Sequence, residues 1–134
     1  MNPESTFSKK VKFSAETTII QEGDKGGPFY ILIEGKCEVL KRDFPMTTLG
    51  KKGIIFGEMS MLLDIPRTAT VKAYSDVEAI EVNITLDNMF NHYPKTTKSI
   101  IRTLAKRVVH QTDVLYGYIV EEELTEFDEI DKEE

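Results

Sequence analysis

Between residues 17 and 82 the chain consists of short runs of β-branched and aromatic residues, separated by turns that contain glycine. Runs of this length and composition predict strands. Gly23 and Gly35 stand between runs, at positions where glycine tolerates a positive φ. Many short strands at this spacing favour a small antiparallel barrel, roll or sandwich. The predicted strands cover residues 17–21, 29–34, 36–41, 47–49, 70–73 and 77–82.

The hydrophobic period changes from strand-like to helix-like after Val82. Thr85 is a residue type that caps helices, so it predicts a short helix that reaches Phe90. Pro94 suits the first turn of a longer helix, which we expect over residues 95–119. Apolar residues recur along that helix at alternating steps of three and four, which places them on one face. This seam consists of Ile101, Leu104, Val108, Gln111, Leu115 and Tyr118.

A seam of this kind most often packs into the protein's own core. This helix carries further apolar residues outside the seam, namely Ile100, Val109, Val114 and Ile119. Its apolar area is therefore large enough to pack against two surfaces. We therefore expect a homodimer formed through the helix from Ile101 to Tyr118.

The charge of the chain is unevenly distributed. The net charge is −6, but residues 121–134 hold nine acidic side chains and one Lys, which leaves the first 120 residues at +2. A run of like charge at a chain end favours a solvated, flexible tail over a docking peptide. The acidity also argues against direct DNA binding, because the tail would be repelled by a phosphate backbone.

Length and composition exclude several other classes. The 134 residues, 40% of them hydrophobic, suit one globular domain. No apolar run is long enough to span a membrane, and the polar N-terminus does not resemble a signal peptide. Cys37 is the only cysteine. A single cysteine excludes an internal disulfide and fits a reducing cytoplasmic compartment. We expect Cys37 to be a buried apolar residue rather than a reactive thiol.

The segment 56–71, FGEMSMLLDIPRTATV, carries the chemistry. Gly57 lets the backbone approach a ligand closely, and the residues after it can form helical turns whose free N–H groups attract an anion. Arg67 has a planar fork of donors that suits two-point contact with phosphate. Glu58 would be out of place beside phosphate alone, but it could accept a hydrogen bond from a sugar hydroxyl.

These residues closely resemble the phosphate-binding cassette of the cyclic-nucleotide-binding domain family. The matching motifs are Phe-Gly-Glu at 56–58 and Pro-Arg-Thr-Ala-Thr-Val at 66–71, at the interval usual in that family. The resemblance covers roughly residues 10–118 and includes the glycines Gly23 and Gly35. It implies a mainly β fold: an antiparallel β-roll of jelly-roll type over about 13–84, with a short cassette helix. C-terminal helices over about 85–119 would complete one domain, residues 1–120.

The resemblance also implies a role for each cassette residue. The amides of Gly57, Met59 and Ser60 would line the cyclic phosphate, and Arg67 would pair with an exocyclic phosphate oxygen. Glu58 would accept a hydrogen bond from the ribose 2′-hydroxyl. Thr68 would contact phosphate or purine. The plainer alternatives are a surface salt bridge between Arg67 and Glu58, and an ordinary turn residue at Thr68.

Two positions on the long helix are candidates for the purine contact. In the family this helix closes over the base, and the catabolite-activator type uses polar residues that align with Gln111 and Thr112. Gln111 has a second interpretation, as a buried polar residue that sets the register of a helix pair. Thr68 resembles cGMP-selective members, whereas Gln111 with Thr112 resembles cAMP-binding ones. We expect cAMP rather than cGMP, with no further cofactor.

Three functions remain in competition. The first is a non-catalytic sensor that binds a cyclic mononucleotide and changes its dimer geometry. The second is a metal-dependent barrel enzyme, which the sequence disfavours because His92 and His110 are its only histidines and both fall in helices. The third is a dimerising interaction module with a vestigial nucleotide site. The family's leading helices and a DNA-reading motif have no counterpart in the sequence.

Overall fold

The computed structural model describes the backbone of residues 7–133 and the side chains of residues 7–120. The chain divides into two compact units, residues 1–93 and 94–134. That residues 1–120 act as one domain stays a prediction.

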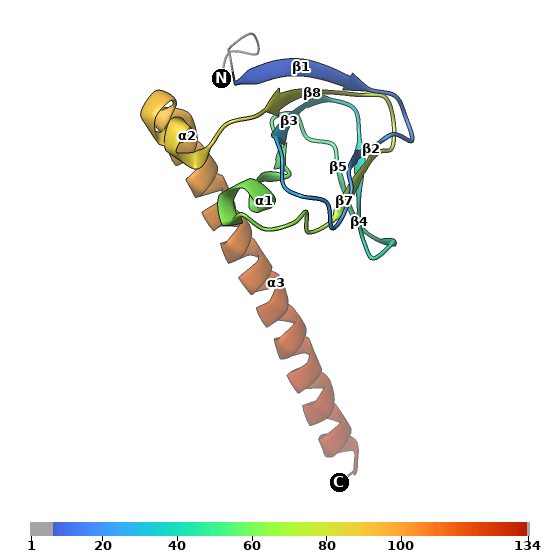
Figure 1. Cartoon of the computed structure of the whole chain (residues 1–134). Coiled ribbons are helices and arrows are strands. Elements are labelled where there is room, and N and C mark those ends of the chain that lie inside the picture. Colours follow the sequence, from blue (N-terminus) through green and yellow to red (C-terminus); the bar gives the residue numbers. More distant parts are fainter. Residues whose placement is uncertain (1–6, 134) are drawn as a thin grey trace. The chain divides into compact units, whose positions relative to one another are not determined.

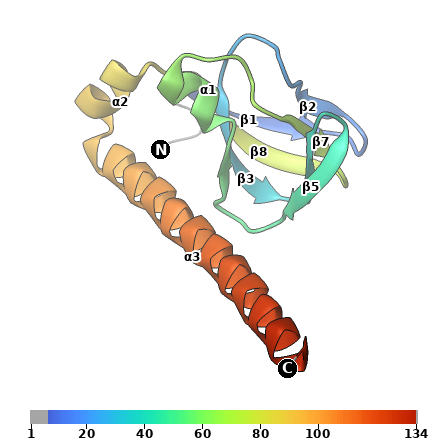
Figure 2. The ribbon, with the colours of Figure 1, turned by 90° about the horizontal axis from the view of Figure 1, so that it is seen from below.

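The first unit is built on two four-stranded sheets, which Figures 1 and 2 show wrapped into a roll. The strand orders are β1-β8-β3-β6 and β2-β7-β4-β5, and every paired strand is antiparallel. The strands are β1 (Ser8–Phe13), β2 (Thr18–Ile20), β3 (Phe29–Glu34), β4 (Cys37–Lys41), β5 (Phe44–Leu49), β6 (Ile55–Phe56), β7 (Thr70–Ala73) and β8 (Val77–Val82). The predicted fold class, an antiparallel roll with helices, is confirmed.

The core lies inside the roll, where alternate residues of the strands point inward. Tyr30 on β3 stacks on Phe56 of β6 with ring centroids 5.3 Å apart, and Phe13 of β1 meets Tyr30 edge-on at 6.0 Å. The other buried members of this cluster are Ile20, Leu32, Cys37, Val71, Ala73, Val77 and Ala79. Burial raises the pKa of the Cys37 thiol to about 11, which fits the expected packing role.

Two turns depend on unusual backbone conformations. Gly35 joins β3 to β4 at φ 98°, and a Cβ there would lie 2.2 Å from the Asp76 carbonyl oxygen. Arg42 and Asp43, at φ 50° and 65°, form the two-residue turn between β4 and β5. Positive φ at both central residues is the conformation that tight hairpins favour. Both turns are therefore stiff, and they fix the strand ends that they join.

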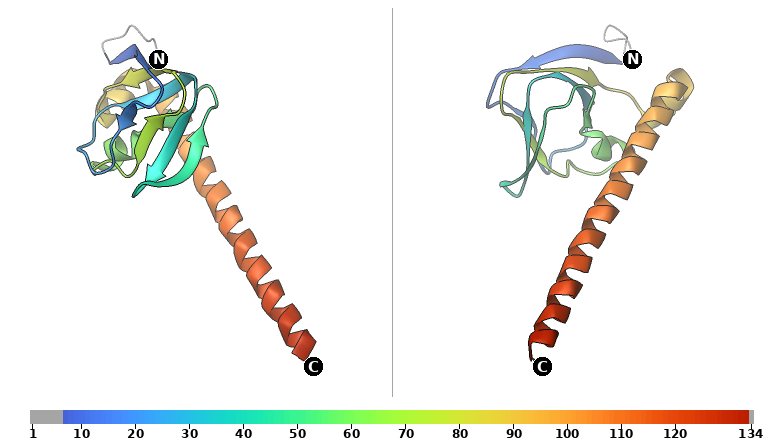
Figure 3. Two further views of the ribbon diagram at one scale, coloured as in Figure 1. Left: turned by 90° about the vertical axis from the view of Figure 1, so that its right-hand side faces the viewer. Right: turned by 180° about the vertical axis from the view of Figure 1, so that it is seen from behind.

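Three helices complete the described chain. α1 (Glu58–Leu63) follows β6 directly. α2 (Leu86–His92) begins after Thr85, whose side-chain oxygen accepts a hydrogen bond from Asn88 N at 3.2 Å, so the predicted cap is confirmed. α3 (Pro94–Glu133) forms the second unit and is a single long helix in Figure 3.

Most predicted elements are present, with four larger differences besides shifts of one or two residues at the ends of β2, β4, α2 and α3. β5 begins at Phe44 rather than at residue 47, and α3 continues past residue 119. β1 and β6 were not predicted. β1 is an edge strand rich in lysine, which hides its strand pattern, and β6 is only two residues long. The side chains of residues 121–134 lie outside the described part, so the flexible acidic tail stays a prediction.

Candidate functional site

The segment between β6 and β7 folds as a turn, a short helix and an extended return. Gly57 is the N-cap of α1 with φ 81°, and no side chain caps the helix. A Cβ at this glycine would lie 2.7 Å from Ile20 Cδ1 and 3.1 Å from Arg67 Nη1. Only glycine therefore combines this conformation with this packing, and the first amides of α1 stay clear of side-chain cover.

Arg67 is buried, with 8% of its surface exposed. Its Nη1 donates to the Gly57 carbonyl and to Ser60 Oγ, both at 2.8 Å, and its Nη2 donates to the Pro28 carbonyl at 2.6 Å. The guanidinium is thus held between the N-terminal turn of α1 and the loop that leads into β3.

The backbone of Arg67 is fixed as well. Arg67 N donates to Asp24 O at 2.8 Å, and Gly23 N donates to Arg67 O at 2.9 Å. These two bonds form a short bridge between the turn after β2 and the strand-like end of the cassette. Both the backbone and the side chain of Arg67 are therefore held by hydrogen bonds within the first unit.

Two adjacent glycines allow the loop before β3 to pack on the cassette. A Cβ at Gly26 would lie 3.2 Å from Ser60 Cβ, and one at Gly27 would lie 3.3 Å from Arg67 Nη2. Neither glycine has a positive φ. The sequence marks them as a turn, but the structure shows that their contribution is close packing.

Burial sets the electrostatics of the site. It lowers the pKa of the Arg67 guanidinium, and the nearby charges of Tyr30 and Asp24 partly oppose this effect. Burial likewise raises the pKa of the Tyr30 hydroxyl, and Glu81 adds to that shift while Arg67 opposes it. Because an arginine stays protonated at neutral pH even after such a shift, the site presents a buried positive charge.

The first unit brings six of the predicted residues together on one segment. Glu58 and Ser60 are buried with 4% and 5% exposure, whereas Met59 and Thr68 are exposed. The burial of both Glu58 and Arg67 excludes the alternative of a surface salt bridge between them. The roles of Gly57, Glu58, Met59, Ser60, Arg67 and Thr68 toward a ligand stay predictions.

The two candidates for the purine contact lie in the second unit. Gln111 and Thr112 are exposed residues of α3, and the Thr112 hydroxyl donates to Val108 O at 2.9 Å. Their predicted contact with a base stays a prediction.

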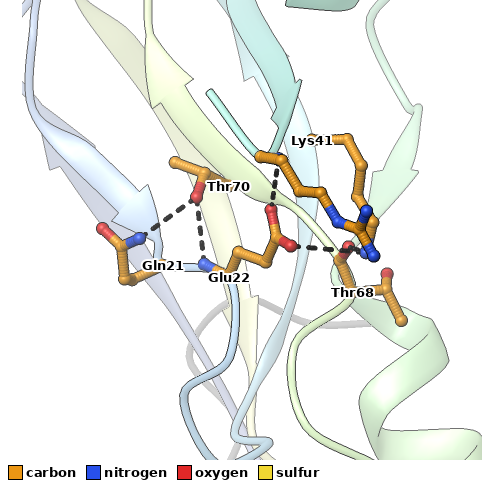
Figure 4. A network of polar contacts seen from close by, with 6 residues as sticks. Gln21, Glu22, Lys41, Thr68 and Thr70 are labelled. Atoms are coloured by element: carbon orange, nitrogen blue, oxygen red, sulfur yellow. Dashed lines mark hydrogen bonds and ion pairs between the residues drawn. The ribbon is translucent and has the colours of Figure 1, made fainter. Parts of the chain in front are cut away.

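The structure adds a polar network that sequence reasoning missed (Figure 4). Lys41 Nζ at the end of β4 donates to the Thr68 carbonyl at 2.6 Å and lies 3.4 Å from Glu22 Oε2. Glu22 Oε1 accepts from Arg42 N at 2.8 Å. No pattern in the sequence could have joined these segments, because the contact spans 27 positions and depends on the hairpin turn.

An open groove of about 600 Å³ adjoins the cassette. Its lining includes Gly26, Ser60 and Ile65 on one side and Ile84 and Thr85 on the other. This groove gives a small molecule access to the face of the first unit that carries α1.

The described residues contain no group of three or more histidine, cysteine or acidic side chains placed to hold a metal ion. His92 on α2 instead packs its ring against Phe7 at 5.7 Å between centroids. Across the same residues, no helix has the length and apolar content needed to cross a membrane.

Comparison with known proteins gives consistent matches. The family model described as a cyclic nucleotide-binding domain matches residues 10–90. A cAMP-dependent protein kinase regulatory subunit from Aspergillus fumigatus is 41% identical over 70 residues, which cover 51% of this chain and 17% of that protein. The chain thus spans about a sixth of that relative's length.

Two solved structures show the same fold. The cAMP-bound form of the EAL enzyme Bd1971 matches with a TM-score of 0.56 and 31% identity, over 75% of this chain and 28% of that one. The catabolite activator protein of Thermus thermophilus matches with a TM-score of 0.70 and 23% identity, over 81% of this chain and 53% of that one.

Proposed function

Because the chain belongs to the cyclic nucleotide-binding domain family, we propose that it is a non-catalytic sensor that binds a cyclic mononucleotide, cAMP rather than cGMP. The observation that carries this proposal is the buried guanidinium of Arg67 beside the uncapped N-terminus of α1. A buried positive charge next to a helix N-terminus without a side-chain cap is an arrangement that binds one small anion.

The donors of Arg67 support a two-point phosphate contact. A guanidinium has five N–H groups. Within the described part of the chain, Gly57 O, Ser60 Oγ and Pro28 O take up three of them. The Nε–H and one Nη2–H remain, and these two nitrogens lie on one edge of the planar group. A phosphate with two exocyclic oxygens matches that edge.

Glu58 supplies the second half of the recognition. It follows Gly57 directly and is the first residue of α1, with 4% of its surface exposed. A carboxylate is an acceptor, so it pairs with a hydroxyl and is repelled by phosphate. We assign the ribose 2′-hydroxyl to Glu58, and the cyclic phosphate to Arg67 and the amides of Gly57, Met59 and Ser60.

The choice of cAMP rests on the residues assigned to the purine and on the relatives. The cAMP-bound structure of Bd1971 and the regulatory subunit of a cAMP-dependent kinase both point to an adenine nucleotide. In our proposal Thr68 contacts phosphate or purine, and Gln111 and Thr112 contact the base. A competition titration of cAMP against cGMP tests this choice, and preference for cGMP would contradict it.

We further propose that the chain forms a homodimer through α3. Four apolar members of its seam are exposed, at 53% for Ile101, 61% for Val108, 60% for Leu115 and 65% for Tyr118. A second copy is the partner whose pattern matches this seam along its whole length. We expect nucleotide binding to change the geometry of this dimer. We also expect the protein to act in the cytoplasm without direct contact to DNA or membrane.

Isothermal titration with cAMP tests the binding proposal. Arg67→Ala is expected to abolish binding because it removes the only charge assigned to the phosphate. Arg102→Ala, which removes an exposed arginine of α3, is the matched control and should bind as the wild type does. No heat with either cAMP or cGMP at high micromolar concentration would overturn the proposal. Dimers with no nucleotide binding would favour the alternative, an interaction module with a vestigial site.

A further inference from the structure

Three segments far apart in the sequence meet beside the C-terminal end of the cassette, and Figure 4 shows their polar contacts. They are the turn after β2, the tip of the β4–β5 hairpin, and the residues from Thr68 to Thr70. The Thr70 hydroxyl oxygen accepts from Glu22 N at 3.0 Å and from Gln21 Nε2 at 3.3 Å. Glu22 thus binds the cassette end through its backbone and the hairpin through its carboxylate.

These contacts fix the peptide planes on both sides of Thr68. The Arg67 carbonyl accepts from Gly23 N, and the Thr68 carbonyl accepts from Lys41 Nζ. In a trans peptide the C=O and N–H groups point in opposite directions, and the described chain contains no cis peptide. The amides of Thr68 and Ala69 are therefore directed away from Gly23 and Lys41.

The pair contributes little to the folding of the roll. The Lys41 side chain is 46% exposed and the Glu22 side chain 24% exposed, and exposed ion pairs add little to stability. Lys41 lies at the end of β4, where the two-residue turn at Arg42 and Asp43 places Arg42 N on the same Glu22 carboxylate. The interaction adds little to folding stability, but it orients the residue after Arg67. Its role is therefore best explained by ligand binding at the cassette.

We propose that Glu22 and Lys41 are positioning residues for the nucleotide site. Lys41 holds the peptide plane after Thr68, and Glu22 holds Lys41 through its carboxylate and Thr70 through its backbone amide, so less conformational freedom is lost when a ligand binds. Neither side chain is assigned a contact with the ligand. This proposal rests on the proposed function, since a site without a nucleotide has nothing to position.

Titration of cAMP into the variant Lys41→Met tests the role, because methionine keeps the length of the side chain and removes the ammonium. We expect the Kd to rise about tenfold, the loss typical of one charge-assisted hydrogen bond. Lys41→Arg restores a donor and should stay within about twofold of the wild type. Glu22→Gln keeps an acceptor for Arg42 N but loses the charge, and should give an intermediate loss.

Lys10→Met is the matched control. Lys10 forms an ion pair of similar length with Glu78, 3.3 Å against 3.4 Å, on β1 and β8 and outside the cassette. The variant Lys10→Met should leave the Kd for cAMP unchanged and should shift the melting temperature as much as Lys41→Met does. Equal affinities of Lys41→Met and Lys10→Met would overturn the positioning role while leaving the proposed function intact. A wild type that binds no nucleotide would overturn both.

Hydrogen exchange supplies a readout that needs no ligand. In the free protein, Lys41→Met should speed amide exchange in the peptide that spans residues 64–72, and Lys10→Met should not. Unchanged exchange in that peptide would show that Lys41 does not order the cassette end, and would overturn the proposal independently of the titration.

Discussion

Gly57, like Gly35, combines a positive φ with crowding at the Cβ position. It has φ 81°, and a Cβ there would crowd Ile20 and Arg67. Gly53 has φ 90° but nothing within 4 Å of its Cβ position. Comparing alanine at the two sites therefore separates backbone strain from crowding.

Gly57→Ala should destabilise the fold by about 2 kcal/mol or more, and Gly53→Ala by about 1 kcal/mol, since both force alanine into the left-handed region. Only Gly57→Ala should also weaken cAMP binding, because the added methyl displaces Arg67 Nη1, which lies 3.1 Å away. Urea unfolding and titration measure the two effects. Equal losses at both sites would show that crowding at the cassette is unimportant.

The buried thiol of Cys37 leads to a prediction of how the stability of the fold changes at alkaline pH. Its pKa is raised by burial from 9.0 to about 11, so the folded protein holds the thiol proton more tightly than the unfolded chain does. The contribution of this pKa difference to the free energy of unfolding is complete below pH 9.0 and is lost as the pH rises through about 11. Denaturant unfolding across this range should show decreasing stability.

Cys37→Ala is the control for that dependence. It should flatten most of the alkaline loss, leaving a smaller part from Tyr30, whose pKa burial also raises. In the wild type at pH 8, the buried neutral thiol should react with iodoacetamide far more slowly than it does in urea. Rapid labelling of the folded protein would contradict the burial of Cys37.

At the scale of elements, the local hydrophobic pattern predicted those strands whose bounds depend on residues close together in the sequence. Strands β3, β7 and β8 have the predicted bounds because their β-branched residues alternate between buried and partly buried positions. β1 was missed because SKKVKF reads as a charged segment until its pairing with β8 is known. An edge strand with lysines on it is an ordinary protection against aggregation, and sequence alone does not reveal it.

The same division holds within the site. The cassette motif identified Gly57, Glu58 and Arg67, since their chemistry and spacing lie within one short segment. The packing of Gly26 on Ser60 and the bond from Lys41 to the Thr68 carbonyl join different elements. Such contacts follow from topology, in particular from the β4–β5 turn that presents Lys41, and a linear pattern does not contain that information.

At the scale of the whole molecule, the net charge of −6 does not oppose an anionic ligand. Residues 121–134 account for the acidity, whereas the proposed site for the anion is at Arg67, whose side chain is held by hydrogen bonds to Gly57 and Pro28. Binding of one small anion depends on local geometry at a desolvated site, whereas long-range charge governs the approach of large polyanions. The net charge of the chain is therefore compatible with the proposed binding of a cyclic phosphate.

The seam of α3 predicts the oligomeric state. Leu115 is 60% exposed and lies on the seam, whereas its neighbour Tyr116 is 69% exposed and lies off it. Leu115→Glu should convert dimer to monomer, because it places a charge in the apolar contact of each copy. Tyr116→Glu adds the same charge outside the contact and should leave the dimer intact. Sedimentation equilibrium over a range of concentrations measures both.

Gln111 refines this prediction, since a polar residue at one seam position fixes register at a cost in stability. Gln111→Leu should therefore strengthen the dimer if Gln111 faces its counterpart, and should weaken cAMP binding if its amide contacts the base. Measuring dimerisation and affinity on the same variant separates the two interpretations. A wild type that stays monomeric at every concentration would contradict the dimer, and the exposed seam would then require a different partner.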